Sequence, residues 1–235
     1  MFLDAFHTAN QNLISITPQQ ASQFAKEVCD DFNPLHNPDN KRFLVPGDLL
    51  FSLTLSRLGL RKNMVFKFTG MLGKDSQIHF PQAAAEQMQI IDGNDKTCID
   101  IHAQGELIEN PTVIESYIKS YVSFSGHSFP HLLVPLMQDN QVMINPARPM
   151  VMYESMGFEF SSTDLTKPEL EFSGSKLELN GKRGTVTLNF SINDQGKQVG
   201  HGFKTMLLSG LKEYDQAAID NLIKVYETAK ADYFA

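Results

Sequence analysis

Residues 46–58 read Pro-Gly-Asp-Leu-Leu-Phe-Ser-Leu-Thr-Leu-Ser-Arg-Leu, and this stretch gives the strongest structural signal in the chain. Its leucines and its phenylalanine cover most of the circumference when the stretch is wound as a helix, so no wide polar face is left. Such a helix is stable only where other parts of the chain surround it. The stretch therefore predicts a central helix that begins near Pro46 and ends near Leu58.

The segment that follows predicts a sheet around this helix. Region 97–108 alternates apolar Ile99 and Ile101 with polar Asp100 and His102, which is typical of a strand with one buried face. Strand patterns also occupy 64–72, 77–80 and 87–91. Because no helical pattern separates these strands, the sequence favours an α+β fold over an alternating α/β fold.

The same order of patterns is repeated in the second part of the chain. Helical patterns at 113–124 and 128–137 precede strand patterns at 150–161, 169–179, 184–192 and 198–209, and an amphipathic helix capped by Asp215 follows. We expect the apolar pattern at 128–137 to form the buried helix of this part. We therefore expect an α+β double hot-dog fold, in which two antiparallel sheets each curl around a buried helix. The expected units are residues 1–110 and 111–235, packed side by side.

The most informative polar segment lies just before the central helix and reads Asp31-Phe32-Asn33-Pro34-Leu35-His36. A helix predicted at 18–30 ends there, because Pro34 cannot continue it. The turn that Asn33 and Pro34 favour lets the Asp31 carboxylate and the His36 imidazole converge. Together these groups can hold and polarise one water, which is general acid–base chemistry. The alternative is that Asp31 caps a helix end and His36 is a surface loop residue.

The stretch Phe24–Arg42 resembles the signature of the MaoC-like, (R)-specific enoyl-CoA hydratases, which contains the motif D-x-N-P-x-H. Asp31, Asn33, Pro34 and His36 match that motif. The resemblance implies reversible addition of water across a 2-enoyl thioester, carried by coenzyme A or by an acyl carrier protein. We expect no cofactor and no metal ion.

The resemblance also implies a role for each matching residue. Asp31 and His36 would bind the catalytic water, and the Gly47 N–H would bind the thioester oxygen. A helix N-terminus favours the negative charge that develops on that oxygen. The acyl chain would lie beside the central helix. The substrate-binding residues expected on this basis are Asn33, Arg42, Phe43 and Phe51.

Three residues depart from the family pattern. Asp30 replaces the glycine before the motif, Arg42 replaces a small residue after His36, and Asp48 replaces an apolar residue at the start of the helix. Asp30 and Asp48 add negative charge near the site, which a pair between either of them and Arg42 would partly neutralise. These departures indicate an altered substrate or a loss of catalysis.

Two other functions therefore stay open. The first is a catalytically inactive hot-dog protein that binds an acyl chain or another apolar ligand, or that serves in assembly. The second is an acyl thioesterase, in which the activated water attacks the thioester carbonyl. Acyl-serine hydrolysis and nucleotide chemistry have little support, because the sequence has no G-x-S-x-G motif, no P-loop and no G-x-G-x-x-G motif.

Composition limits the expected partners and location. The 20 basic and 27 acidic residues give a net charge of −7, which argues against binding to nucleic acid or to an anionic membrane. No apolar run is long enough to span a membrane and no signal peptide is evident, so we expect a cytoplasmic protein, with a homodimer possible. Cys29 and Cys98 are too few for a disulfide framework. His127 and His131 lie four residues apart, but no third metal ligand lies near them in the sequence.

Overall fold

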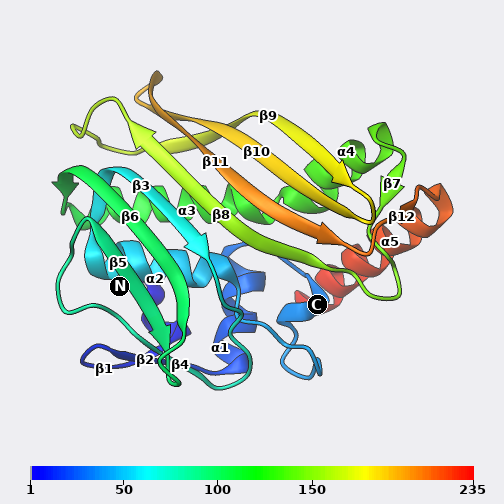
Figure 1. The fold of residues 1–235 in the computed structure, drawn as a ribbon, viewed down its shortest axis with the longest axis horizontal. Coiled ribbons are helices and arrows are strands. Elements are labelled where there is room, and N and C mark those ends of the chain that lie inside the picture. The colour runs from blue at the N-terminus through cyan, green and yellow to red at the C-terminus, as the bar shows by residue number, and fades with distance from the viewer. Residues whose placement is uncertain (1) are drawn as a thin grey trace.

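The computed structural model describes residues 2–235 and confirms the α+β double hot-dog fold. Its main feature is one antiparallel sheet, with helices gathered behind it in the view of Figure 1. In spatial order the strands are β1 (Thr8–Asn10), β2 (Leu13–Ile16), β4 (Ser76–His79), β5 (Gln87–Asp92), β6 (Thr97–Ile108), β3 (Leu60–Phe68), β8 (Val151–Phe160), β11 (Lys197–Ser209), β10 (Arg183–Asp194) and β9 (Glu169–Asn180).

The helices and short turns occupy the rest of the fold. The α-helices are α1 (Pro18–Gln23), α2 (Gly47–Leu58), α3 (Pro111–Gly126), α4 (Leu133–Asp139) and α5 (Gln216–Tyr233). Helix α1 continues as a π-helical turn at Phe24–Val28, and another π-helical turn, Ser128–Leu132, leads into α4. Short 3₁₀ turns lie at Phe2–Phe6 and Pro34–His36, and β7 (Val142–Met143) pairs with β12 (Lys212–Glu213).

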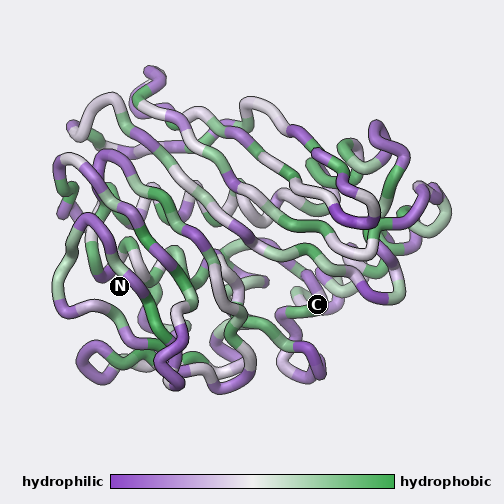
Figure 2. Tube along the Cα trace, in the orientation of Figure 1, coloured by the Kyte–Doolittle hydropathy of each residue, from purple (hydrophilic) through white to green (hydrophobic). Residues whose placement is uncertain are grey.

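The two parts of the chain meet in the middle of the sheet, where β3 pairs with β8. Val65 lies opposite Gly157 in this antiparallel pair. The sheet is therefore continuous from β1 at one edge to β9 at the other. Figure 2 shows that hydrophobic and hydrophilic residues interchange along many strands. In β10 every second residue from Gly184 to Asp194 is buried, as a strand with one face toward the core requires.

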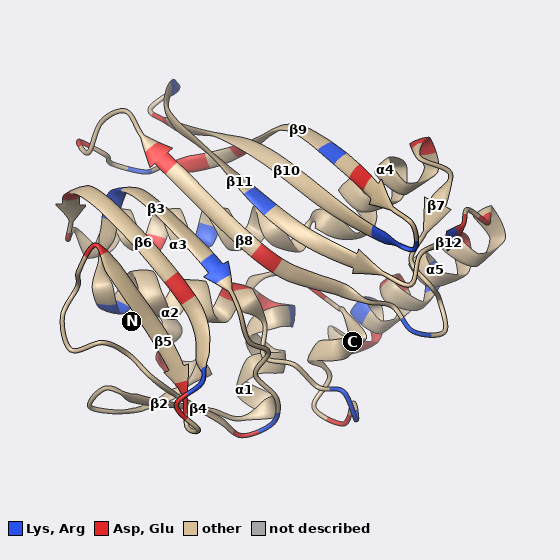
Figure 3. Cartoon of the chain, in the orientation of Figure 1, with Lys and Arg blue, Asp and Glu red and all other residues tan. Residues whose placement is uncertain are grey.

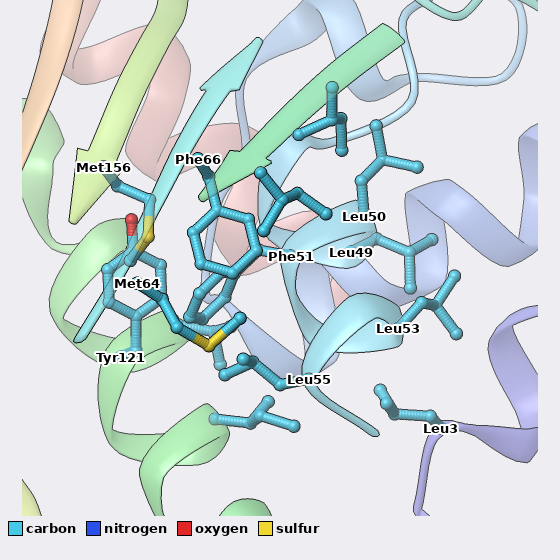
Figure 4. Close-up of a cluster of buried hydrophobic side chains, with 14 of the residues drawn as sticks. Leu3, Leu49, Leu50, Phe51, Leu53, Leu55, Met64, Phe66, Tyr121 and Met156 are labelled. Atoms are coloured by element: carbon cyan, nitrogen blue, oxygen red, sulfur yellow. The ribbon is translucent and has the colours of Figure 1, made fainter. Parts of the chain in front are cut away.

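Helix α2 is the central helix that the sequence predicts. Its residues from Asp48 to Leu55 are all buried. Phe51 packs against Phe66 of β3 and Tyr121 of α3, with ring centroids 5.1 and 4.4 Å apart. Figure 4 shows these rings within a cluster of leucine and methionine side chains. These eight residues have no exposed side because the sheet, the π-helical turn at Phe24–Val28 and α3 pack around them.

The second central helix differs from the sequence prediction. The pattern at 128–137 was expected to form it, but the long buried helix of this part is α3. Tyr117, Ile118, Tyr121 and Val122 of α3 are completely buried. Pro130 interrupts the 128–137 segment, which consequently forms a π-helical turn and the short helix α4.

Local interactions define the ends of several elements, and among them the predicted Asp215 cap is confirmed. Thr17 and Gln20 form a capping box at the start of α1, where the Gln20 N–H donates to Thr17 Oγ1 at 3.2 Å. Asp215 caps α5 by accepting a hydrogen bond from the Ala218 N–H at 3.1 Å. Gly181 lies in the turn between β9 and β10 with a φ of +57°, a conformation that suits glycine.

Candidate active site

The motif segment forms a tight turn between the first helical region and α2. The Asp31 N–H donates to Ala25 O at 2.8 Å, which ends the π-helical turn. The Asn33 N–H then donates to Asp31 Oδ1 at 2.9 Å, and the Leu35 N–H donates to Asn33 Oδ1 at 3.0 Å. These side-chain bonds to the backbone compete with helix formation and fix the turn before Pro34.

Asp31 and His36 converge as the sequence predicts. His36 Nε2 lies 3.6 Å from Asp31 Oδ2, and the two side chains are 13% and 27% exposed. A distance of 3.6 Å is too long for a direct hydrogen bond, but one water molecule can reach both atoms. The pair therefore offers a place for one water at its open side.

A backbone contact sets which nitrogen of His36 faces this place. Nδ1 lies 2.8 Å from the carbonyl oxygen of Leu44. Because a carbonyl only accepts, Nδ1 carries the hydrogen, and Nε2 of the neutral ring is left as an acceptor. The Asp31 carboxylate is also an acceptor. A water between them donates both its hydrogens and keeps its oxygen lone pairs free for attack on an electrophile.

Gly47 and Asn33 line the same cavity as the acid–base pair. Gly47 is the first residue of α2, so its N–H has no partner within the helix, and the helix dipole favours negative charge there. A Cβ atom at Gly47 would lie 3.0 Å from the Tyr153 ring. Glycine therefore lets β8 approach the helix start closely.

The cavity has a volume of about 330 Å³, within the usual range for small-molecule sites. Most of its wall is apolar and comes from both halves of the sheet, the loop before α2, and helices α4 and α5. Apolar lining side chains include Leu50, Phe68, Leu133, Ile144, Met206 and Leu222. The Asp31–His36 pair thus lies at the wall of a hydrophobic chamber.

Helix α5 contacts the backbone on both sides of Asp31. The Tyr226 hydroxyl donates to Asp30 O at 3.0 Å and accepts from the Phe32 N–H at 3.2 Å. Burial raises the pKa of Tyr226, and the nearby Asp31 carboxylate acts in the same direction. Figure 1 shows α5 beside the region of the first helices, although these segments are far apart in the sequence. The motif is therefore held by the last helix.

Asp30 replaces the glycine of the family motif without placing its charge at the acid–base pair. Its φ is +57°, the left-handed region that glycine adopts readily and that aspartate tolerates better than most residues. Its Oδ2 accepts a hydrogen bond from Lys230 Nζ of α5 at 2.5 Å. The expected pair with Arg42 is absent from the described residues.

Arg42, Phe43 and Phe51 lie away from the cavity wall that the described residues form. Arg42 is exposed, and its Nη1 lies 3.7 Å from the sulfur of Met150. Phe43 and Phe51 are buried in the hydrophobic core. The structure therefore does not bring these three side chains to the chamber, whereas it brings Asn33 there.

Asp48 also differs from the pairing that the sequence suggests. It is 7% exposed and its Oδ2 accepts a hydrogen bond from Ser125 Oγ at 2.6 Å, while Lys204 Nζ donates to the same serine oxygen. Burial raises the pKa of Asp48, against the opposing effects of Lys204 and of the Ser125 hydrogen bond. Asp48, Ser125 and Lys204, which we call the buried polar cluster, all line the chamber.

The other polar candidates stay outside the chamber. The rings of His127 and His131 have centroids 5.6 Å apart. Among residues 2–235, no group of three histidine, cysteine, aspartate or glutamate side chains is arranged to hold a metal ion. Cys29 is buried, and burial raises the pKa of its thiol well above the usual value.

Comparison with protein families supplies one decisive match. Residues 1–217 match the family described as Protein of unknown function (DUF3581). The chain belongs to this family. None of the curated proteins matches it.

The DUF3581 protein is also similar to several solved structures. Against the full-length peroxisomal multifunctional enzyme type 2 from Drosophila melanogaster it has 10% identity and a TM-score of 0.44, over 83% of this chain and 47% of that enzyme. The chain thus spans about half the length of that enzyme. The tesB protein of Mycobacterium avium subs. paratuberculosis gives 7% identity and a TM-score of 0.44, over 88% of this chain and 97% of that one. A MaoC-like dehydratase gives 10% identity and a TM-score of 0.41, over 87% and 97% respectively.

Two further observations concern the charges of the DUF3581 protein and the polarity of its helices. Figure 3 shows acidic and basic residues interspersed over strands and loops of both halves. Among the residues that the structure describes, no helix is long and apolar enough to cross a membrane.

Sequence reasoning missed Ser125, Lys204 and Tyr226 as residues of the site. A signal for Lys204 exists, because it occupies an inward position in β11 between Gly202 and Met206, where a lysine interrupts a buried face. Ser125 similarly continues the buried four-residue spacing of Tyr117 and Tyr121 in α3. Because a buried polar group is costly without a partner, a charged or hydroxyl side chain at a core-facing position indicates that another polar group of the fold lies beside it.

Proposed function

We propose that the DUF3581 protein is a divergent relative of the MaoC-like hydratases, which adds water to a 2-enoyl thioester or removes it from the 3-hydroxyacyl thioester. The observation that carries this proposal is the 3.6 Å separation of Asp31 Oδ2 and His36 Nε2 at the wall of the apolar chamber. The chamber suits an acyl chain, and the pair suits one water. Arg42, one of the three departures from the motif, does not line the chamber and so does not fill it.

The residues act as follows in the direction of hydration. Asp31 and His36 orient one water, whose oxygen bonds to C3 of the enoyl group while the pair accepts a proton. The π electrons of the C2–C3 bond move toward the thioester oxygen, where the Gly47 N–H at the start of α2 stabilises the developing charge. The enolate then takes a proton at C2 from the pair, which restores the starting state.

The test follows the loss of absorbance of the conjugated enoyl group with 2-enoyl-CoA substrates of increasing chain length. Asp31→Asn and His36→Ala are expected to lower turnover by about 10²–10⁴-fold. Asp39→Asn is the matched control, because Asp39 is a carboxylate of the same loop region that does not line the chamber. No turnover at any chain length, or equal turnover in all variants, would overturn the proposal.

A thioesterase is separated from a hydratase by the product. If the same water attacks the thioester carbonyl, free thiol is released, and a thiol reagent detects it in the same samples. Thiol release that depends on Asp31 and His36 would support these residues as the active site but would identify the reaction as thioester hydrolysis.

A further inference from the structure

The chamber contains polar groups that the hydration chemistry does not use. Asp48 comes from the first turn of α2, Ser125 from the end of α3, and Lys204 from β11. Ser125 Oγ links the other two, since it donates to Asp48 Oδ2 at 2.6 Å and accepts from Lys204 Nζ. All three side chains line the chamber. The buried polar cluster therefore places an anion and a cation around one hydroxyl oxygen.

The cluster is not satisfied by its own hydrogen bonds. Asp48 is 7% exposed, and its Oδ1 has no hydrogen-bond partner among the described residues. Lys204 is 4% exposed, and Ser125 Oγ is the one hydrogen-bond acceptor that its ammonium reaches within residues 2–235. An ammonium has three hydrogens to donate. The buried hydroxyl of Tyr153, whose ring lies 4.4 Å from Lys204 Nζ, also lacks a partner in this part of the chain.

Leaving such groups unpaired in an apolar wall costs free energy, so a ligand that supplies the missing partners gains affinity. Asp48 Oδ1 needs a donor and Lys204 needs an acceptor. A ligand carboxylate would satisfy Lys204 but be repelled by Asp48, and a ligand amine would satisfy Asp48 but be repelled by Lys204. A hydroxyl group is neutral and does both, since it donates one hydrogen bond and accepts others.

We propose that the buried polar cluster is a subsite for a hydroxyl group on the acyl chain of the ligand. The inference rests on the proposed function, since it takes an acyl thioester as the ligand of the chamber. The protein would then prefer chains with a hydroxyl at the carbon that reaches Asp48 and Lys204, in addition to the position where water is added or removed at Asp31 and His36.

The test measures binding by calorimetry with thioether analogues of acyl-pantetheine, which cannot be hydrolysed or hydrated. The analogues are matched in chain length and differ only in a hydroxyl placed at successive carbons. The wild type is expected to bind one hydroxylated analogue about tenfold or more tightly than the plain chain, because a site built for a hydroxyl discriminates against its absence. Asp31→Asn is expected to keep this preference while losing turnover.

Variants of the cluster locate the preference. The double variant Asp48→Leu/Lys204→Met replaces both charges with apolar groups of similar size and is expected to bind the plain chain at least as tightly as the hydroxylated one. Lys197→Met, an exposed lysine of the same strand, is the matched control and keeps the wild-type preference. Equal affinity of the wild type for all analogues, or a preference that survives the double variant, would overturn the subsite alone. Binding of none of the analogues would overturn the proposed function as well.

Discussion

The Asp31–His36 pair and the buried polar cluster line the same chamber but are built in opposite ways. The pair comes from one six-residue segment, is partly exposed, and leaves a 3.6 Å gap between its members. The cluster is buried, and hydrogen bonds link Ser125 to Asp48 and to Lys204, which lie 77 and 79 positions away from it in the sequence. Local sequence brings the members of the first arrangement together, and α5 then holds the backbone around Asp31. The second arrangement exists only where the folded sheet and both central helices meet.

The comparison predicts different consequences when each arrangement is broken, and the largest concerns activity at the pair. Asp31→Asn keeps the oxygen that accepts from the Asn33 N–H but removes the negative charge that orients the water in the proposed reaction. We expect turnover to fall by about 10²–10⁴-fold and stability to change by less than about 1 kcal/mol, because the side chain is partly exposed. Urea unfolding beside the enoyl assay separates these effects. A loss of stability large enough to unfold the variant under assay conditions would account for the lost turnover and remove the contrast with the cluster.

The second prediction concerns stability at the cluster. Lys204→Met leaves the buried Asp48 carboxylate without its cation, and breaking a buried charge pair typically costs about 3–5 kcal/mol. We expect a loss of about this size in urea unfolding, with Lys197→Met near the wild-type value. A variant that unfolds like the wild type would show that the cluster carries little electrostatic energy.

This deficit is expected to depend on pH. Removal of Lys204 raises the pKa of Asp48 further, because the cation that lowers it is gone. Where folding raises the pKa of a carboxyl, the protonated group favours the folded state. This contribution is fully present below the pKa that the group has in the unfolded chain, and it is lost as the pH rises through its pKa in the folded chain. The stability deficit of Lys204→Met relative to the wild type should therefore shrink as the pH falls toward the ordinary carboxyl range near about 4. A deficit that grows as the pH falls would contradict this sign.

A smaller effect is expected when both charges are removed together. Replacement of a buried ion pair by apolar residues of similar volume is often neutral or stabilising. Asp48→Leu/Lys204→Met should therefore unfold within about 1–2 kcal/mol of the wild type, well above Lys204→Met alone. Denaturant midpoints of the two single variants and the double variant give the coupling energy, and a double variant that sums both single losses would rule out compensation.

The smallest effect is expected at the ion pair between Asp30 and Lys230. Both side chains are more than a third exposed, at 39% and 36%, so solvent screens the interaction. Lys230→Met should cost no more than about 0.5–1 kcal/mol and leave turnover nearly unchanged. Thermal unfolding at low and high salt measures the stability change, and the enoyl assay measures turnover. A large loss of turnover would show that the ion pair positions Asp31.

The sequence was sufficient to predict the parts that depend on local chemistry. The apolar run of α2 required a surrounding sheet, and Pro34 required the turn that brings Asp31 toward His36. The partners of Asp48 could not be predicted, because its nearest basic residue in the sequence is not the one that the fold places beside it. Arg42 points outward to Met150, and Lys204 approaches from β11.

The strands β1 and β2 were missed for a related reason. They are only three and four residues long, too short to show a convincing alternation. Strand β2 pairs with β4, where Ile14 lies opposite Ile78, and β1 pairs with β2. Such short strands near a sheet edge acquire their structure from the neighbouring strand rather than from their own residues.

The hydroxyl of Tyr226 belongs to a helix that is synthesised late, yet it fixes a segment of the site that is synthesised early. It binds the backbone at Asp30 and Phe32, almost two hundred positions earlier in the chain, which were made long before it. A ribosome-bound intermediate that lacks α5 can form the turn at Pro34 but lacks these two contacts. The Asp31–His36 pair therefore reaches its final setting only after α5 has been made and has packed against the motif.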